Sequence, residues 1–438
     1  MMDSSSALLQ HPAPAHFSDD TQSRRFTAPR FSREFSLLLA CMNGAEQENI
    51  RKLICGGIDW RNLLRITRHH RLIPQVYDRL RHLHDLVPTE ALEKLRDLYQ
   101  ANVRHTFRLT RDLVRVLEHV ESRGIPALAY KGPTLAAILC GDFTQRQYSD
   151  LDLLVHPSDV QISKSALSEL GYKPGRSLTP RQEESYIRSG YEYVFDLPDA
   201  RNVLELKWRI LPHFYSIEFD VSGLFDRSVF VEVSGHSMRT LCPEDLLLVL
   251  CVHAAKHAWS ELSLLWDVSR LIQSQPMNWS RVREQAALLG ICRIVDINLA
   301  LAHSLLGTVL PASTEAPVAM EKAPVPLMRR MLSAVSQGQQ LDTESVSYFR
   351  LMLNLRERLR DRVRFLWRLL FTPNIGEWDT VRLPARLFPL YHGVRMYRLA
   401  GKLFKYFLLK VLPLRQQVGR ARPLSRVKGS IGSMTVGR

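Results

Sequence analysis

The chain has 438 residues, of which 45% are hydrophobic and 24% charged, values typical of a globular protein of roughly two or three domains. No uncharged apolar run approaches the ~20 residues of a membrane-spanning helix, and the N-terminus lacks the features of a secretory signal. The net charge of +15 is concentrated at the C-terminus, where the segment from residue 380 onward contains 13 Lys and Arg but no Asp or Glu. The remaining 46 basic and 44 acidic residues nearly balance, so the charge of the core does not support a nucleic-acid substrate.

The six cysteines indicate neither a disulfide framework nor a zinc site. No two of them form a C-x-x-C pair, and most lie within apolar runs. We therefore expect free, buried thiols in a reducing compartment, which favours a cytoplasmic location.

Apolar periodicity divides the chain into an α/β region between two helical regions. Residues 1–30 have the composition of a disordered leader, and residues 31–121 place apolar side chains at helical intervals. Residues 122–242 contain short apolar runs typical of strands. Residues 243–380 are again helical, and residues 381–438 predict a basic helix followed by a disordered tail. The predicted fold class is α+β, a small mixed-sheet core flanked by N-terminal and C-terminal helical regions.

The individual elements follow from the same patterns. Strands are expected at residues 125–130, 149–155, 191–197, 202–208, 230–233 and 237–241. Helices are expected at residues 89–120, 133–139, 158–170, 243 to about 274, 282–289, 294–306 and 327–335, and a long Arg-rich stretch runs from 348 to 370.

Two aspartates in the second predicted strand are the strongest candidates for chemistry. Asp150 and Asp152 are separated by one residue, so on a strand they face the same side. Adjacent carboxylates repel each other, and a strand has little structural reason to hold them. A divalent cation such as Mg²⁺ removes that cost, because it prefers carboxylate oxygens together with substrate phosphates.

A glycine upstream and a glutamate downstream complete this pattern. Gly132 lies between a predicted strand and a predicted helix, where backbone N–H groups and the helix dipole can approach a phosphate. Glu205 is the single acid in the apolar strand at 202–208 and supplies a third carboxylate. This combination is typical of phosphoryl and nucleotidyl transfer sites, in which two metal ions clamp the attacking and leaving oxygens.

These motifs resemble the nucleotidyltransferase superfamily with the DNA-polymerase-beta-like fold. More narrowly, the chain is similar to a bacterial family of uncharacterised nucleotidyltransferases, over roughly residues 35–400. The motifs that carry the resemblance are Tyr130-Lys131-Gly132, Arg146 before Asp150-Leu151-Asp152-Leu153-Leu154-Val155, Glu205-Leu206-Lys207-Trp208, His253-Ala254-Ala255-Lys256-His257, Leu265-Trp266-Asp267, and the later Leu383-Pro384, Tyr391 and Arg395.

The resemblance implies a Mg²⁺- or Mn²⁺-dependent enzyme that moves a nucleoside monophosphate from an NTP to an acceptor, which could be a small molecule, a glycan or a protein. Two residues depart from the family pattern: Pro133 replaces a hydroxyl residue after the glycine, and Lys207 replaces the usual histidine after the third acid. Thr134 is expected to take over the phosphate contact. The departures also keep open an alternative, a catalytically weak nucleotide-binding or scaffold protein of the same fold in a biosynthetic or toxin–antitoxin-like system.

Four further residues are candidates for nucleotide binding. Lys131 and Arg146 bracket the acidic motif and could neutralise triphosphate charge, although Arg146 could equally pair with Asp150. His253 and His257 lie four residues apart on one helix face, a spacing compatible with a substrate contact, with a transition metal or with packing.

The segment 397–412 combines apolar and basic residues. Such a helix can dock onto its own domain or lie on an anionic membrane. The sequence favours docking and leaves peripheral contact with the inner membrane surface as the alternative.

Overall fold

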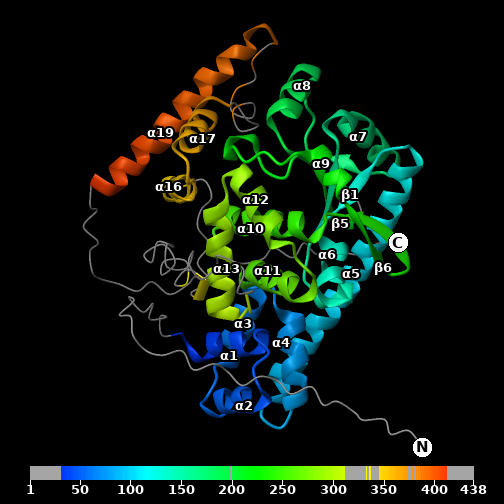
Figure 1. Cartoon of the computed structure of the whole chain (residues 1–438), viewed down its shortest axis with the longest axis vertical. Helices are drawn as coiled ribbons and strands as arrows, with labels where there is room; N and C mark the ends of the chain where they lie inside the picture. The colour runs from blue at the N-terminus through cyan, green and yellow to red at the C-terminus, as the bar shows by residue number, and fades with distance from the viewer. Residues whose placement is uncertain are drawn as a thin grey trace, which may run out of the picture.

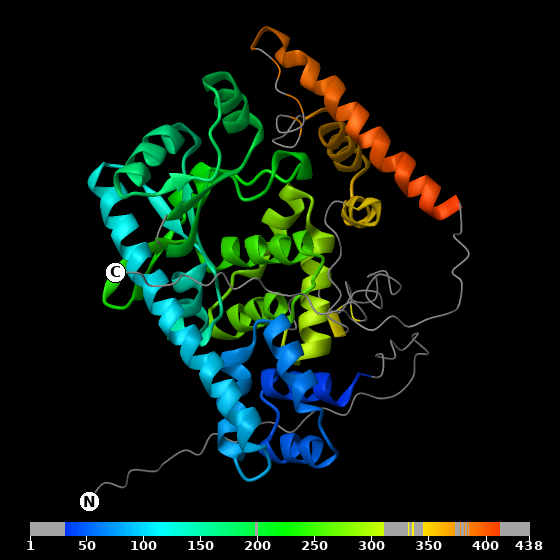
Figure 2. The ribbon, with the colours of Figure 1, turned by 180° about the vertical axis from the view of Figure 1, so that it is seen from behind.

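The computed structural model describes residues 31–197, 200–310, 332, 335–336, 345–372, 377, 381, 383 and 385–411. A sheet and the long helix α5 (Thr89–Ser122) form one side of the molecule, and a group of helices forms the other (Figures 1 and 2). The predicted leader, the predicted tail and most of the helix expected at 327–335 lie outside the described residues.

The N-terminal helices form a compact group that ends in α5. Helix α1 begins after Ser32, whose side chain accepts a hydrogen bond from the backbone N–H of Phe35. Helix α5 covers the predicted range 89–120 and buries one apolar stripe of its surface. The other helices of this group are α2 (Gln47–Cys55), α3 (Trp60–His69) and α4 (Ile73–Leu80).

The main sheet has five strands in the order β1-β2-β5-β4-β3. Strands β2 and β5 are parallel, and the other neighbours are antiparallel. The sheet is therefore mixed, and the predicted α+β fold class is confirmed. The strands are β1 (Ala127–Ala129), β2 (Asp150–Val155), β3 (Lys173–Pro174), β4 (Glu192–Leu197) and β5 (Ala200–Lys207).

Several elements of this region differ from the sequence prediction. The strands expected at 230–233 and 237–241 exist as β6 (Val229–Val233) and β7 (His236–Thr240), but they pair with each other in a separate two-stranded sheet. The short strand β3 and helix α8 (Pro180–Ser189) lie in a polar segment that gave no periodic signal. The helices that follow β1 and β2 are α6 (Gly132–Cys140) and α7 (Val160–Glu169), close to the expected ranges.

The C-terminal helices pack against the N-terminal group, and one continuous apolar core includes residues of both. The helical stretch expected to end near 274 is two helices, α10 (Pro243–Lys256) and α11 (Leu262–Ser274). Between them, Ala258 and Trp259 adopt left-handed backbone conformations with φ of 50° and 52°. The remaining helices are α9 (Val221–Asp226), α12 (Trp279–Leu289), α13 (Cys292–Leu306), α16 (Val346–Asn354), α17 (Leu359–Phe371) and α19 (Tyr391–Val411).

The cysteines are free, as expected, but they are not all buried. Cys41, Cys242 and Cys251 are buried, whereas Cys55 is exposed at the end of α2. The expectation of burial is therefore wrong for Cys55, which ends an amphipathic helix on its solvent side.

None of the helices in the described part of the chain is long and apolar enough to span a membrane. Helix α19 begins with Tyr391 and Arg395 buried, and it packs against α17. Its first turns therefore contact the rest of the protein, whereas Tyr397 and Phe404, in the segment expected to dock, are 83% and 65% exposed, so docking of that segment stays a prediction.

The turn between α10 and α11 is held by a buried hydrogen bond. Trp259 is fully buried, and its Nε1 donates to Oδ1 of Asn298 on α13 at 3.0 Å. The Asn298 amide donates in turn to the carbonyl oxygens of Cys251 and Ile294. We expect Asn298→Ala to lower the free energy of unfolding by about 2 kcal/mol, because it leaves the indole N–H buried without an acceptor. Chemical denaturation measures this change, and Leu288→Ala, at an exposed position of α12, should leave the midpoint unchanged.

Candidate active site

Strand register places the acidic side chains on one face of the sheet. In the parallel pair of β2 and β5, Asp152 lies opposite Glu205. Asp150 precedes Asp152 by two residues, and Lys207 follows Glu205 by two, so all four side chains share that face. In the antiparallel pair of β4 and β5, Glu192 lies opposite Lys207 and joins the group.

Gly132 begins helix α6 beside the acidic face of the sheet. Its φ of +57° lies in the left-handed region, and a Cβ there would lie 3.4 Å from the carbonyl oxygen of Asp150. Both constraints favour glycine, since the chain turns sharply from β1 into α6 against the strand that carries the aspartates.

Two lysines compensate the buried acids. Lys131 Nζ lies 3.4 Å and Lys207 Nζ 3.3 Å from the same oxygen of Asp152, Oδ1. Burial alone would raise the pKa of Asp152, but the two ammonium groups lower it to about 2. Asp152 is therefore ionised at neutral pH although only 2% of its surface is exposed.

Glu205 and Glu192 respond differently to the same lysine. Lys207 Nζ lies 2.6 Å from Glu205 Oε2 and also contacts Glu192 Oε2. Burial raises the pKa of Glu205 above its usual value, with Lys207 opposing and Asp152 and Glu192 adding to the rise. For Glu192 the attraction of Lys207 and Lys256 outweighs burial, and its pKa is lowered.

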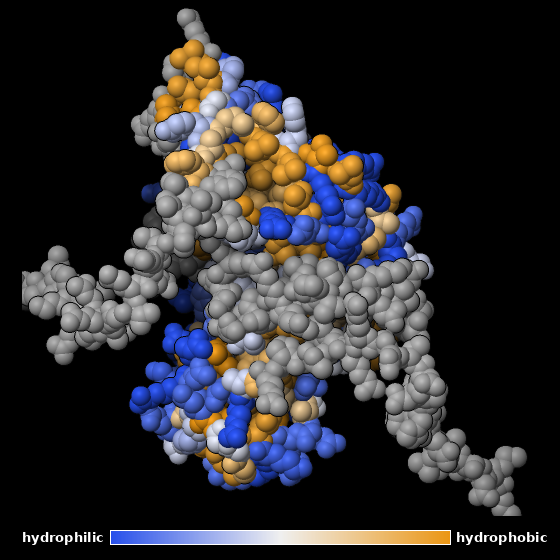
Figure 3. All heavy atoms as spheres, turned by 90° about the vertical axis from the view of Figure 1, so that its left-hand side faces the viewer, coloured by the Kyte–Doolittle hydropathy of each residue, from blue (hydrophilic) through white to orange (hydrophobic). Residues whose placement is uncertain are grey.

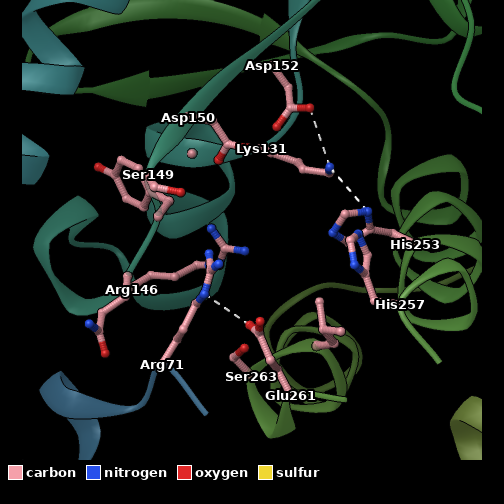
Figure 4. Close-up of a pocket in the computed structure, with 14 residues that line it drawn as sticks. Arg71, Lys131, Arg146, Ser149, Asp150, Asp152, His253, His257, Glu261 and Ser263 are labelled. Carbon is pink, nitrogen blue, oxygen red and sulfur yellow. Dashed lines mark hydrogen bonds and ion pairs between the residues drawn. The ribbon is translucent and has the colours of Figure 1, made fainter. Parts of the chain in front are cut away.

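A pocket of about 140 Å³ opens beside the aspartates (Figure 4). Seven of the nine residues expected from the sequence line it, and they come from β2, from the β1–α6 and α6–β2 connections, and from α10 and its end. These residues are Lys131, Gly132, Arg146, Asp150, Asp152, His253 and His257.

The other two expected residues do not line the pocket. Glu205 belongs to the acidic cluster, paired with Asp152 across the strands, but it is not part of the pocket lining. Thr134 is fully buried, and its hydroxyl lies 2.8 Å from the carbonyl oxygen of Ala129 and 2.9 Å from that of Lys131. Its hydroxyl donates to the backbone of the β1–α6 turn and does not face the pocket, so the phosphate contact expected of Thr134 stays a prediction without support from this geometry.

Two arginines form the basic wall of the pocket. Arg146 makes a bidentate ion pair with Asp267 of α11, with both N–O distances at 2.8 Å. Its partner is thus Asp267 and not Asp150. Arg71, which the sequence did not indicate, enters from the turn after α3 and is held by Glu261 at 3.0 Å (Figure 4). Arg71 has φ of 54°, so a left-handed backbone turns this residue towards the pocket.

The two histidines are part of the pocket wall and are neutral. Their rings lie 4.6 Å apart, and His253 Nδ1 is 3.4 Å from Lys131 Nζ. Burial, and next the charge of Lys131, lowers the pKa of His253 well below its usual value. Burial, Lys256 and Lys131 likewise lower the pKa of His257 to about 4. Neutral rings beside lysine can accept hydrogen bonds or donate them to a substrate without adding charge.

The acidic cluster fits a hard divalent cation. One oxygen from each of Asp150, Asp152 and Glu205 lies within 4.8 Å of the others. Carboxylate oxygens are the ligands that Mg²⁺ and Mn²⁺ prefer. Among the described residues this is the one group able to hold such an ion, and it does not include His253 or His257.

The comparison with known families gives a clear result for the region that carries this site. Residues 56–307, more than half of the chain, match the model of a family described as uncharacterised nucleotidyltransferases. The chain belongs to this nucleotidyltransferase family. The match includes every residue of the acidic cluster and of the pocket. No curated protein matches the chain.

Three solved structures are similar over less than half of this chain. The crystal structure of ANT(2")-Ia in complex with adenylyl-2"-tobramycin has 13% identity and a TM-score of 0.31, covering 42% of this chain and 97% of that one. The solution structure of the antibiotic-resistance factor ANT(2'')-Ia has 14% identity and the same TM-score, covering 42% and 91%. An antigenic nucleotidyltransferase-like protein from Paracoccidioides brasiliensis has 15% identity and a TM-score of 0.28, covering 46% and 92%. These scores are too low to transfer ligands or residue roles to this chain.

The Arg146–Asp267 pair gives a test of how the basic wall is held. Only 15% of the Arg146 side chain and 2% of the Asp267 side chain are exposed. We expect Asp267→Asn to lower the free energy of unfolding by about 3 kcal/mol, because it leaves the buried guanidinium without its counter-charge. Denaturation by urea measures the change. Asp78→Asn, which removes the partner of the exposed Arg81, should leave stability unaltered, and equal losses in both variants would contradict the role of the buried pair.

Proposed function

We propose that the protein is a metal-dependent nucleotidyltransferase that moves a nucleoside monophosphate from an NTP to an acceptor hydroxyl, phosphate or protein side chain. One observation carries this proposal. The two aspartates of β2 lie in the same pocket as Lys131, Arg71 and Arg146, at the glycine where α6 begins. Acids that attract a metal ion and cations that attract phosphate are thus held together.

The charges on the two sides of the pocket suit a triphosphate bound with a metal ion. Asp150 and Asp152 would hold Mg²⁺ or Mn²⁺, with Glu205 as the third carboxylate of the set. Such an ion, when bound, supplies positive charge that stabilises the charge developing on the transferred phosphoryl group. Lys131 and the two arginines would hold the outer phosphates, and Arg146 is already oriented by Asp267.

The size of the pocket limits which part of the nucleotide it can enclose. Its volume of about 140 Å³ is below the ~300 Å³ at which sites begin to enclose a whole ligand. The pocket is therefore suited to the phosphates, and the base and ribose would lie towards its mouth. This arrangement agrees with a site that recognises triphosphate charge more strongly than base identity.

The transfer itself would be an in-line displacement at the α-phosphorus. The acceptor oxygen forms a bond to phosphorus as the bond to the bridging oxygen breaks, and pyrophosphate leaves with the former bridging oxygen. The acceptor proton needs a base near the reacting oxygen. Glu205 is the candidate from the sequence, and burial raises its pKa, but it would have to act from behind the pocket lining, where it contacts Lys207.

We expect Asp152→Asn to lower transfer from an NTP by at least ~100-fold, because it removes a charge that the transition state requires. The assay incubates each α-labelled NTP with Mg²⁺, the protein and candidate acceptors, and measures the labelled product. Asp196→Asn is the matched control, since Asp196 is an exposed acid on the adjacent strand β4.

Two outcomes would count against this proposal. If wild type and Asp152→Asn formed the same amount of product, the assigned site would be wrong. If calorimetry detected no heat with any NTP in the presence of Mg²⁺ or Mn²⁺, the scaffold alternative would be favoured, because a nucleotidyltransferase must bind its donor.

A surface on α17 and α19 supports a second proposal, contact with an anionic membrane. Leu359, Val363, Leu366 and Trp367 recur at helical intervals on α17 with 40–75% of each residue exposed. Arg360 and Arg364 stand beside this stripe, with side chains 75% and 49% exposed. Figure 3 shows the side of the molecule that carries α19, where apolar and hydrophilic residues alternate in the upper half.

We propose that this surface lies on anionic lipid at the inner face of a cytoplasmic membrane. Exposed Trp and aliphatic residues next to Arg suit the boundary between head groups and acyl chains. The segment from residue 380 adds 13 basic residues and no acidic ones, which complements the charge of anionic lipid.

Vesicle binding tests the membrane contact. We expect the double substitution Val363→Glu, Trp367→Glu to reduce co-sedimentation with phosphatidylglycerol vesicles by about tenfold or more, since each change exchanges apolar burial for repulsion. Leu288→Glu, at a residue of α12 that is 66% exposed, is the control and should bind like wild type. Equal sedimentation of all three proteins, or equal binding to neutral phosphatidylcholine vesicles, would refute the proposal.

A further inference from the structure

Lys207 occupies an unusual position within the acidic face. Its side chain is 4% exposed, and its ammonium group contacts three carboxylates at once. Nζ lies 2.6 Å from Glu205 Oε2 and 3.3 Å from Asp152 Oδ1, and it also contacts Glu192 Oε2. The ammonium group is thus enclosed by carboxylates within the acidic face.

The ammonium group of Lys207 occupies the position that a metal ion shared by Asp152 and Glu205 would take. An ion shared by Asp152 and Glu205 would need an oxygen of each within about 2.0–2.1 Å. Nζ already lies between these two side chains and contacts both. A divalent cation there would overlap the ammonium group or lie directly against it, and like charges repel strongly at such short range.

On its pocket side, Asp152 is contacted by Lys131 but not by Lys207. Asp150 and Asp152 line the pocket, whereas Glu205 and Lys207 are not part of its lining. Lys131 and Lys207 both contact Asp152 at Oδ1, at 3.4 and 3.3 Å. An ion that enters from the pocket can therefore bind Oδ2 together with Asp150.

We propose that Lys207 replaces one of the two metal ions of the site, so that the protein binds a single divalent cation, at Asp150 and Asp152. The inference deepens the proposed function and rests on it, because the ion would accompany the NTP. Glu205 would then not be a ligand of that ion. It stays paired with Lys207 on the far side of Asp152. Lys207 is thus a positioning residue that determines metal stoichiometry.

Metal counting tests the proposal without any activity assay. Purified full-length protein is titrated with Mn²⁺ alone, and bound ions are counted from the loss of the free Mn²⁺ resonance signal. We expect one ion per chain in wild type and none in Asp150→Asn. Lys207→Met, which removes the ammonium group but keeps a side chain of similar length, should bind two ions per chain.

A second lysine provides the matched control. Lys256 is also buried close to the cluster, but its Nζ contacts the hydroxyl of Tyr191 at 3.4 Å and no carboxylate. Lys256→Met should therefore keep one ion per chain. Should Lys207→Met fail to fold with three acids uncompensated, Lys207→Gln retains a hydrogen-bond donor and is expected to bind two ions as well.

The outcomes separate this inference from the proposed function. Two ions per chain in wild type, or one ion in a folded Lys207→Met or Lys207→Gln protein, would overturn the inference and leave the nucleotidyltransferase proposal standing. No bound Mn²⁺ in wild type would overturn the inference, and the absence of NTP binding in the presence of Mn²⁺ would overturn the proposed function as well. If no neutral variant folds, the wild-type count alone decides.

Discussion

The balance of buried charge on one face of the sheet is the constraint on which the site depends. Asp150, Asp152, Glu192 and Glu205 gather there, and an uncompensated carboxylate in such a setting would take up a proton. Lys207 prevents this by contacting three of the acids, and Lys131 reinforces it at Asp152. Asp152 therefore stays ionised before any ligand binds, which is the state that a ligand of a divalent cation needs.

This balance is a product of strand pairing more than of local sequence. The parallel pairing of β2 with β5 sets Asp152 beside Glu205, and the antiparallel pairing of β4 with β5 sets Glu192 beside Lys207. A shift of one residue in either register would turn one set of charges to the other face of the sheet. The same hydrogen bonds that build the sheet thus fix the composition of the site.

Much of the core could be predicted from the sequence because its signals are local. The Asp150-Leu151-Asp152 pattern, the strand-glycine-helix at Gly132 and the single acid at Glu205 all lie on the elements expected for them. The position of Glu192 beside Lys207 could also have been predicted, since counting back along the predicted hairpin of 191–197 and 202–208 sets Glu192 opposite Lys207. Its register is less simple than such a count assumes, because the ladder shifts at Asp196 and Leu197.

Arg71 could not have been predicted in this way. It is separated from Lys131 by 60 residues of chain, and it reaches the pocket only because the α3 end packs against the turn between α10 and α11. His70 accepts the backbone N–H of Leu262 there, and His69 lies 3.3 Å from the carbonyl oxygen of Ser260. Contacts of this kind depend on tertiary packing, which leaves no periodic or motif signal in either segment. Thr134 is the opposite case. The sequence indicated it as a phosphate contact, but its hydroxyl donates to backbone carbonyl oxygens of the β1–α6 turn.

The turn that carries Arg71 has a wider consequence for how the molecule would respond to its ligand. The pocket is walled by segments near residues 71, 131, 150 and 257, which meet only when both apolar cores are formed. A molecule that spans these walls binds the folded chain and not the unfolded one, so its binding free energy adds to the stability of the whole assembly. Occupancy of this small pocket would then act as a cross-link between distant parts of the sequence, raising the resistance of the entire protein to heat and proteolysis.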